Sequence, residues 1–156
     1  MTESRTWVLV LSRRHALAAA ADGQLMTSTG KRPALAQLAV GDRVLLYSPR
    51  TDHPDGEALR AVTAIGEVTG PEPVEAEAGR FRRAARLKVI EPVPLAEIRE
   101  HLPLPLLRFG CVPLSDERGD AVWSIVRTWS KKRRRNPISK AERQAVIVSG
   151  PVGNDR

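Results

Sequence analysis

The feature of this sequence that most constrains its fold is a succession of short strand-like runs, separated by turns that contain proline or glycine. Runs of Val, Leu, Ile and aromatic residues bounded by turn-forming residues are typical of β-strands. Gly66, inside the third run, indicates a bulge or a close approach of two backbones at that point. The runs that we predict to be strands are Thr6–Ser12, Arg43–Ser48, Ala58–Thr69 and Arg80–Ile90.

The helical segments that the sequence indicates are short. An alanine-rich stretch that stops at Gly23 is typical of a helix with a glycine cap. Pro33 suits the first turn of a helix, where its missing N–H costs nothing. The predicted helices are Arg13–Asp22, Pro33–Leu38, Leu95–Leu102 and a last one that begins at Asp116 or Asp120 and ends near Trp129.

The order of these segments favours a mixed sheet, because strands and helices do not alternate regularly along the chain. Strands of this length fit a small, half-closed sheet. We therefore predict an α+β fold, with a curled mixed sheet of about five or six strands packed with short helices. Pro103–Pro113 holds three prolines and is expected to wrap the core without regular structure.

The composition is that of an ordinary globular protein, with 42% apolar and 28% charged residues among 156. Its apolar runs are shorter than the roughly 18 residues that cross a bilayer. One cysteine, Cys111, excludes an internal disulfide, and the three histidines lack metal-ligand spacing. We predict a cytoplasmic protein that binds no metal, cofactor or membrane.

The net charge of +7 is concentrated in one segment near the end of the chain. Lys131–Arg143 contains seven basic residues and one acid, Glu142, so it carries +6 and leaves the rest at +1. We predict a domain over residues 1–130 and a basic tail over residues 131–156, with a late strand near 142–149. Such a tail is either a solvated segment or an electrostatic arm that binds phosphates.

Gly30-Lys31 ahead of an apolar run suggests a phosphate-binding loop of the nucleotide-hydrolase type. That loop needs a glycine five residues before the Gly-Lys pair and a Ser or Thr directly after it. Leu25 and Arg32 occupy those two positions. This class of site is therefore excluded.

Six strings in order resemble the EVE domain, and in particular the small bacterial EVE-like proteins of the PUA-like superfamily. They extend from Trp7 to about Val126. Two positions depart from the pattern: Thr29 replaces the usual histidine before Gly-Lys, and Leu46 replaces a frequent tyrosine. The strings are WVLVLS with a histidine three residues later, STGKRPALAQL, VGDRVLLYSP, AVTAIGEV, FRRAARLKV and LRFG.

The resemblance implies a PUA-like pseudobarrel with a pocket for one nucleobase. It implies a non-catalytic reader whose partner is DNA or RNA carrying a modified base. Aromatic faces hold such bases by stacking, at about 1–3 kcal/mol per base. The predicted base-pocket residues are Trp7, Ser12, Lys31, Tyr47, Ser48 and Thr63. The residues predicted to bind phosphates are Arg32, Arg82, Arg83, Lys131, Lys132, Arg133, Arg134 and Arg135.

Structural roles remain open for several of these residues. Trp7 and Tyr47 can equally be core residues, Ser12 can be a helix cap, and Thr63 is a good strand former. Arginines that alternate along a strand often form only a solvated face.

Two other functions also remain open. ASCH-type PUA-like proteins look like amide hydrolases that act on acylated nucleosides through a Lys, a Thr and a Glu. Lys31, Thr63 and Glu67 are the candidates here, and residues four apart on a strand share a face. The ASCH spacing around the lysine is missing. The other function is a general RNA-binding PUA-like module without base preference.

Overall fold

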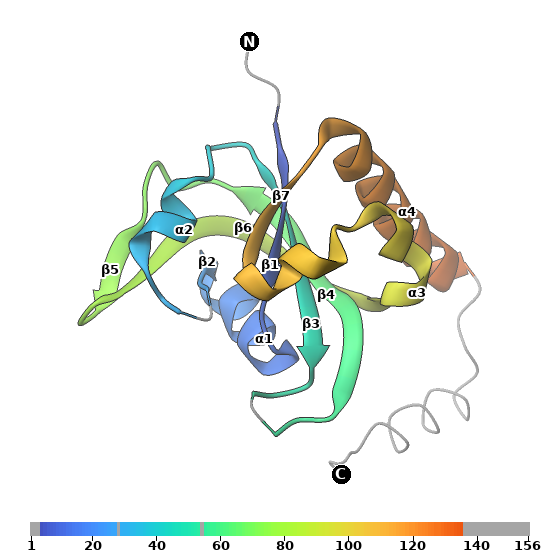
Figure 1. The fold of residues 1–156 in the computed structure, drawn as a ribbon, viewed down its shortest axis with the longest axis horizontal. Coiled ribbons are helices and arrows are strands. Elements are labelled where there is room, and N and C mark those ends of the chain that lie inside the picture. Colours follow the sequence, from blue (N-terminus) through green and yellow to red (C-terminus); the bar gives the residue numbers. More distant parts are fainter. Residues whose placement is uncertain (1–3, 28, 54, 136–156) are drawn as a thin grey trace.

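The computed structural model of the protein describes residues 4–27, 29–53 and 55–135. In this part of the chain seven strands form one curled sheet in the order β2-β6-β4-β3-β1-β7, and β5 also pairs with β6 (Figure 1). The strands are β1 (Thr6–Val10), β2 (Gln24–Leu25), β3 (Arg43–Arg50), β4 (Ala58–Val68), β5 (Val74–Glu77), β6 (Arg80–Pro94) and β7 (Cys111–Leu114).

The sheet is mixed because β1 and β3 run parallel, whereas the other strand pairs are antiparallel. In the parallel pair Trp7 lies opposite Val44, and Val10 lies opposite Tyr47. The predicted fold class is confirmed. Three short strands, β2, β5 and β7, are additional to the predicted set, and β7 replaces part of the segment expected to lack regular structure.

Helices lie on both sides of the sheet (Figure 1). The first ends at Gly23 in the left-handed conformation, as predicted. No helix in the described part of the chain is long and apolar enough to cross a membrane. The α-helices are α1 (Arg13–Asp22), α2 (Arg32–Ala36), α3 (Leu95–Ile98) and α4 (Asp116–Arg135), and the 3-10 helices are η1 (Arg99–His101) and η2 (Leu104–Phe109).

The last helix is longer than predicted. Ser115 precedes it and accepts a hydrogen bond of 3.2 Å from the N–H of Arg118, so the cap is Ser115 and not Asp116 or Asp120. The helix continues to Arg135 and takes in the first part of the basic segment, because Lys and Arg are good helix formers. The expected domain boundary at residue 130 therefore falls inside α4. The rest of the tail and the predicted strand near 142–149 lie outside the described residues.

Gly66 allows β4 and β6 to approach closely. A Cβ atom there would collide with the carbonyl oxygen of Arg86, so the predicted close approach is confirmed. The irregularity in the pairing of β4 with β6 lies elsewhere, between Val62 and Ala64.

The sheet separates two hydrophobic clusters. Trp7, Leu9, Val44 and Leu46 belong to the cluster that includes the buried residues of α1 and α2. Val8, Leu45 and Tyr47 belong to the cluster that includes the buried residues of α3 and α4. Successive side chains of a strand point to opposite faces. Trp7 and Tyr47 therefore lie on opposite faces of the sheet.

Candidate functional site

A cavity of about 350 Å³ lies where β1 and β3 end and α1 begins. Segments that are far apart in the sequence meet here: the end of β1, the start of α1, the residues after β2, the end of β3, the start of β6 and the end of η2. Its volume is at the lower end of the roughly 300–1,000 Å³ typical of small-ligand pockets. The residues that line it are Val10, Leu11, Ser12, His15, Met26, Thr27, Pro49, His53, Arg80, Leu107, Arg108 and Gly110.

The lining combines three kinds of side chain. Its apolar part comes from Val10, Leu11, Met26, Pro49 and Leu107. The hydroxyl groups are those of a serine and a threonine, and two histidines contribute imidazoles. The cations are two arginines. These polar residues are Ser12, Thr27, His15, His53, Arg80 and Arg108. None of the described residues that line the cavity is Asp or Glu. The cavity therefore favours a partly apolar ligand that has hydrogen-bonding groups and an anionic group.

Ser12 and His15 form one polar unit in this cavity. The hydroxyl of Ser12 accepts a hydrogen bond from the N–H of His15 (3.2 Å) and caps α1, and it lies 2.7 Å from Nδ1 of the same histidine. When the hydroxyl donates to Nδ1, the neutral imidazole carries its proton on Nε2. The pair then offers a fixed donor.

The loop that carries His53 is fastened to α1. The carboxylate of Asp52 accepts hydrogen bonds from Nε of Arg14 (2.8 Å) and from the N–H of His53 (2.7 Å). Both bonds lower the pKa of Asp52, and the bond from Arg14 has the larger effect. The backbone N–H of Arg14 also donates to the carbonyl of Thr51 (3.0 Å).

The Gly30-Lys31 pair forms a turn beside Arg80. The N–H of Gly30 donates to the carbonyl and to the hydroxyl of Thr27, both at 3.1 Å. The carbonyl of Gly30 accepts from the N–H of Phe81 (2.8 Å), so the turn is bound to β6. Gly30 has φ of +72°, and a Cβ atom on it would lie 3.0 Å from Cζ of Arg80. The glycine thus leaves space for the guanidinium that lines the cavity.

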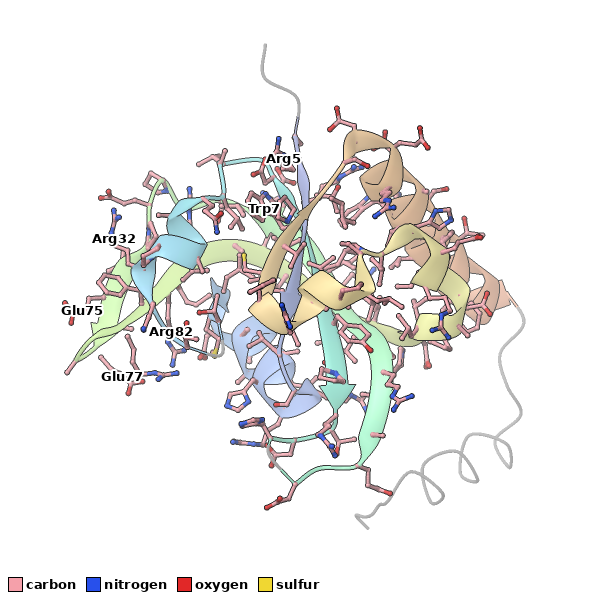
Figure 2. All side chains as sticks on the ribbon, viewed as in Figure 1. Arg5, Trp7, Arg32, Glu75, Glu77 and Arg82 are labelled. Atoms are coloured by element: carbon pink, nitrogen blue, oxygen red, sulfur yellow. The ribbon has the colours of Figure 1, made fainter. Side chains whose placement is uncertain are left out.

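Trp7 does not line the cavity. It is 3% exposed, and its indole N–H donates to Oδ2 of Asp42 (2.9 Å), so the predicted wall with a free donor is wrong. Figure 2 shows it beside Arg5, near the start of β1. At about 3.3 Å per residue, it lies about 10 Å along the strand from Val10, where the cavity begins.

Tyr47, Ser48 and Thr63 are also core residues, so their prediction as pocket residues is wrong. Tyr47 is 6% exposed, and burial raises the pKa of its phenol. The hydroxyls of Ser48 and Thr63 lie 2.7 Å apart in the interior. Of the predicted pocket residues, Ser12 lines the cavity; Lys31 is exposed outside it.

Two neighbouring arginines on β6 have opposite environments. Arg83 is 2% exposed and donates to the carbonyls of Leu35 (2.8 Å), Leu38, Gly70 (3.0 Å) and Pro71 (3.2 Å). Its predicted contact with phosphate is wrong, because the guanidinium is buried and four of its five N–H groups donate to backbone carbonyls. Burial also lowers its pKa.

Arg82 points the other way and forms ion pairs with Glu77 (3.4 Å) and Asp22 (3.5 Å) (Figure 2). Arg32, on α2, is exposed. Both remain predicted phosphate contacts, as do the five basic residues at the end of α4.

A second cavity of about 460 Å³ lies at the opposite ends of β1 and β3, beside Trp123. Two arginines line it, Arg43 and Arg86, and the guanidinium of Arg43 already has partners. Nε donates to the Thr6 hydroxyl (2.9 Å), an Nη atom donates to Asp120 (2.7 Å), and Cζ lies 5.2 Å from the centre of the Trp123 ring. These bonds leave it less available to a ligand than Arg80.

The groups needed for the alternative hydrolase are not brought together in an accessible site. Thr63 is 1% exposed, and Glu67 is 3.7 Å from Arg86 in an ion pair. Burial raises the pKa of the Cys111 thiol to about 12, so at neutral pH it is protonated and a weak nucleophile. No cluster of three or more His, Cys, Asp or Glu side chains suited to a metal occurs within the described residues.

Solved structures of other proteins share this fold. The YTH domain of Zygosaccharomyces rouxii MRB1, solved in complex with N6-methyladenosine RNA, is similar with a TM-score of 0.54, 15% identity, and 81% of this chain and 88% of that one covered. A hypothetical protein of Leishmania major is similar with a TM-score of 0.54 and 12% identity, and the match covers 81% of this chain and 97% of that one. At these identities the likeness shows the fold alone.

No family model matches the chain, but curated proteins do. A UPF0310 protein of Renibacterium salmoninarum is 32% identical over 123 residues, which cover 72% of this chain and 88% of that protein. Another, of Mesorhizobium japonicum, is 32% identical over 127 residues, which cover 72% of this chain and 85% of that protein. A third, of Bacillus subtilis, is 45% identical over 62 residues, which cover 40% of this chain and 42% of that protein. The chain therefore belongs to the UPF0310 family.

Proposed function

We propose that this protein is a non-catalytic nucleic-acid-binding module, and that the cavity at the ends of β1 and β3 holds one modified base of DNA or RNA. The observation that carries the proposal is the composition of that cavity. Apolar side chains, four side chains able to bond a base edge and two guanidinium groups line one cavity, without a carboxylate among the described lining residues.

Each part of the lining matches a part of a nucleotide. The faces of a base are apolar and can pack against Leu11, Met26 and Leu107, and the flexible methionine can adapt to a substituent. Ser12, Thr27 and the imidazoles can bond the base edge. Arg80 and Arg108 can bind phosphate, which guanidinium recognises with paired N–H groups.

A methylated base is the class of ligand that such an apolar lining favours. Burying one more methyl or methylene group contributes about 0.8 kcal/mol, or roughly fourfold in affinity. Taking a base out of a stack costs a few kcal/mol, so the edge contacts are needed as well. The YTH domain of MRB1, which has a similar fold, was solved with RNA that carries N6-methyladenosine, and this supports the choice of ligand class.

The test is a binding screen by fluorescence anisotropy. Single-stranded DNA and RNA oligonucleotides are titrated with the wild-type protein. The oligonucleotides of each pair differ only in whether the central base is methylated. We expect a preference of about fourfold or more for one methylated base. Equal binding to unmodified RNA would instead favour the general RNA-binding module, and no binding to any oligonucleotide would contradict the proposal.

Two arginine variants then locate the site. Arg80→Gln removes a cation from the cavity, whereas Arg86→Gln removes a cation on the same strand that lines the second cavity. Both arginines are exposed, so the two variants differ in the cavity that they change. We expect Arg80→Gln to weaken binding about tenfold, since a charged hydrogen bond is worth about 1.5–3 kcal/mol. Arg86→Gln should change it little. The reverse order would place the ligand at the second cavity.

A further inference from the structure

Phe109 is exposed to an extent that the fold does not require. Its side chain is 65% exposed, more than any other large apolar residue among the described residues. The chain has only six aromatic residues. Aromatic rings contribute much of the energy of a core, so an exposed ring in this chain suggests a role in binding.

Phe109 lies next to the cavity described above along the chain. Phe109 is the last residue of η2, and its chain neighbours Arg108 and Gly110 both line the cavity. Consecutive Cα atoms are about 3.8 Å apart, so the backbone of Phe109 lies within one residue of the lining on either side.

The backbone around Phe109 is held in place by hydrogen bonds. Gly110 adopts φ of +84° and ends η2, and its N–H donates to the carbonyl of Leu107 (3.0 Å). Its own carbonyl accepts from the N–H of Val10 (2.9 Å), which fastens this turn to β1. The exposed ring is therefore presented from a bonded turn.

One face of the ring is already covered. The guanidinium carbon of Arg108 lies 5.0 Å from the ring centroid, in the range of a cation–π contact. A wedge that inserts between two bases needs both of its faces free, so this arrangement disfavours a wedge. A platform that stacks on a single base needs one free face, which the ring has.

We propose that Phe109 stacks on the base next to the one bound in the cavity, with Arg108 on the opposite face of the ring. This inference rests on the proposed function and adds a second contact to it. The cavity would select one base by its substituent and its edge. Phe109 would add affinity for the adjacent base of the strand, whichever base that is, because every base has a π face. The protein would then bind a short single strand more tightly than a single nucleotide.

The experiment compares two lengths of ligand. The wild-type protein and Phe109→Leu are titrated with five-nucleotide single strands that carry central N6-methyladenine or 5-methylcytosine, in DNA and in RNA, and with the corresponding mononucleotides. Phe109→Leu keeps an apolar side chain but removes the π face. Leu17→Ala, another exposed apolar position, on α1, serves as the matched control.

We expect Phe109→Leu to weaken binding of the pentamer about fivefold or more and to leave the mononucleotide unchanged. Phe109→Trp should retain the affinity. 2-Aminopurine placed beside the modified base should lose fluorescence on binding to the wild-type protein but not on binding to Phe109→Leu. Equal affinity of wild type and Phe109→Leu for the pentamer would overturn the inference and leave the proposed function standing. An equal loss with pentamer and mononucleotide would also overturn it. Failure of the wild type to bind any of these probes would overturn both.

Discussion

Oδ2 of Asp42 accepts a 2.9 Å hydrogen bond from the indole N–H of Trp7, and this contact joins the turn before β3 to the start of β1. The same carboxylate accepts from the backbone N–H groups of Arg5 (3.0 Å) and Ala39 (2.9 Å). Asp42 is 5% exposed, so these donors depend on it rather than on water. The parallel alignment of β1 and β3 is thus fixed at the end opposite to the candidate site.

Asp42→Ala should strongly destabilise the fold. It leaves one buried and two partly buried donors without their acceptor, at about 1–3 kcal/mol each, so we expect the free energy of unfolding to fall by about 3 kcal/mol or more. Urea denaturation measures this change. Glu91→Ala, at an exposed position of β6, is the control and should alter stability little. A similar small change in both variants would mean that the Asp42 contacts contribute no net stability.

Arg82 and Arg83 should differ in their contribution to stability although they are neighbours. Arg83→Met removes hydrogen bonds to four buried or partly buried carbonyls, and we expect a loss of about 3 kcal/mol. Arg82→Met removes ion pairs that involve exposed acids, and the expected loss is below about 1 kcal/mol. Equilibrium unfolding of the two variants tests the difference, and equal losses would contradict it.

Gly30 and Gly79 allow the effect of the Arg80 contact to be separated from backbone strain. Both have φ of +72°, but a Cβ atom meets Arg80 at Gly30 and nothing within 4 Å at Gly79. Alanine at either position should cost about 1–2 kcal/mol of stability, the penalty for a left-handed residue with a side chain. We expect only Gly30→Ala to weaken nucleic-acid binding as well, because it displaces a lining guanidinium. Unchanged binding would show that the position of Arg80 is unimportant.

The basic end of α4 should set the salt dependence of binding. Replacing Lys131, Lys132, Arg133, Arg134 and Arg135 by Gln should reduce the slope of log affinity against log salt by about 3 to 4 on single strands, at roughly 0.7 per phosphate contact. The preference for a methylated base should persist, because these residues follow the cavity-forming domain. The slope is measured by titration at several salt concentrations. If it does not change, the phosphate contacts are made by other residues.

The fold was more accessible to prediction than the site. Runs such as Thr6–Ser12 and Arg43–Ser48 can be predicted as strands from their local composition. Gly23 marks the end of α1, because glycine readily adopts the left-handed conformation. The short strands β2 and β7 exist because a neighbouring strand pairs with them, which is a long-range property. The extension of α4 to Arg135 could have been predicted from helix propensity.

The pocket prediction relied too much on aromatic residues. Whether Trp7 and Tyr47 share a face depends on the register of β1 against β3, and with Val10 opposite Tyr47 they do not. Arg80 enters the cavity because Gly30, fifty residues earlier, leaves it space. A useful signal was present in the strings that carry the EVE resemblance. Ser12, Pro49 and Gly110 each end one of these strings, Thr27 directly precedes another, and all four line one cavity.

The charge distribution along α4 has one further consequence. Its 20 residues extend about 30 Å, with Asp116 and Glu117 in the first turn and the five consecutive cations in the last turns. These full charges outweigh the half-charges of the helix backbone and oppose them in direction. The helix thus has a large electric dipole moment, which exerts a torque near a polyanion. We expect the molecule to turn its basic end toward such a partner before any contact forms.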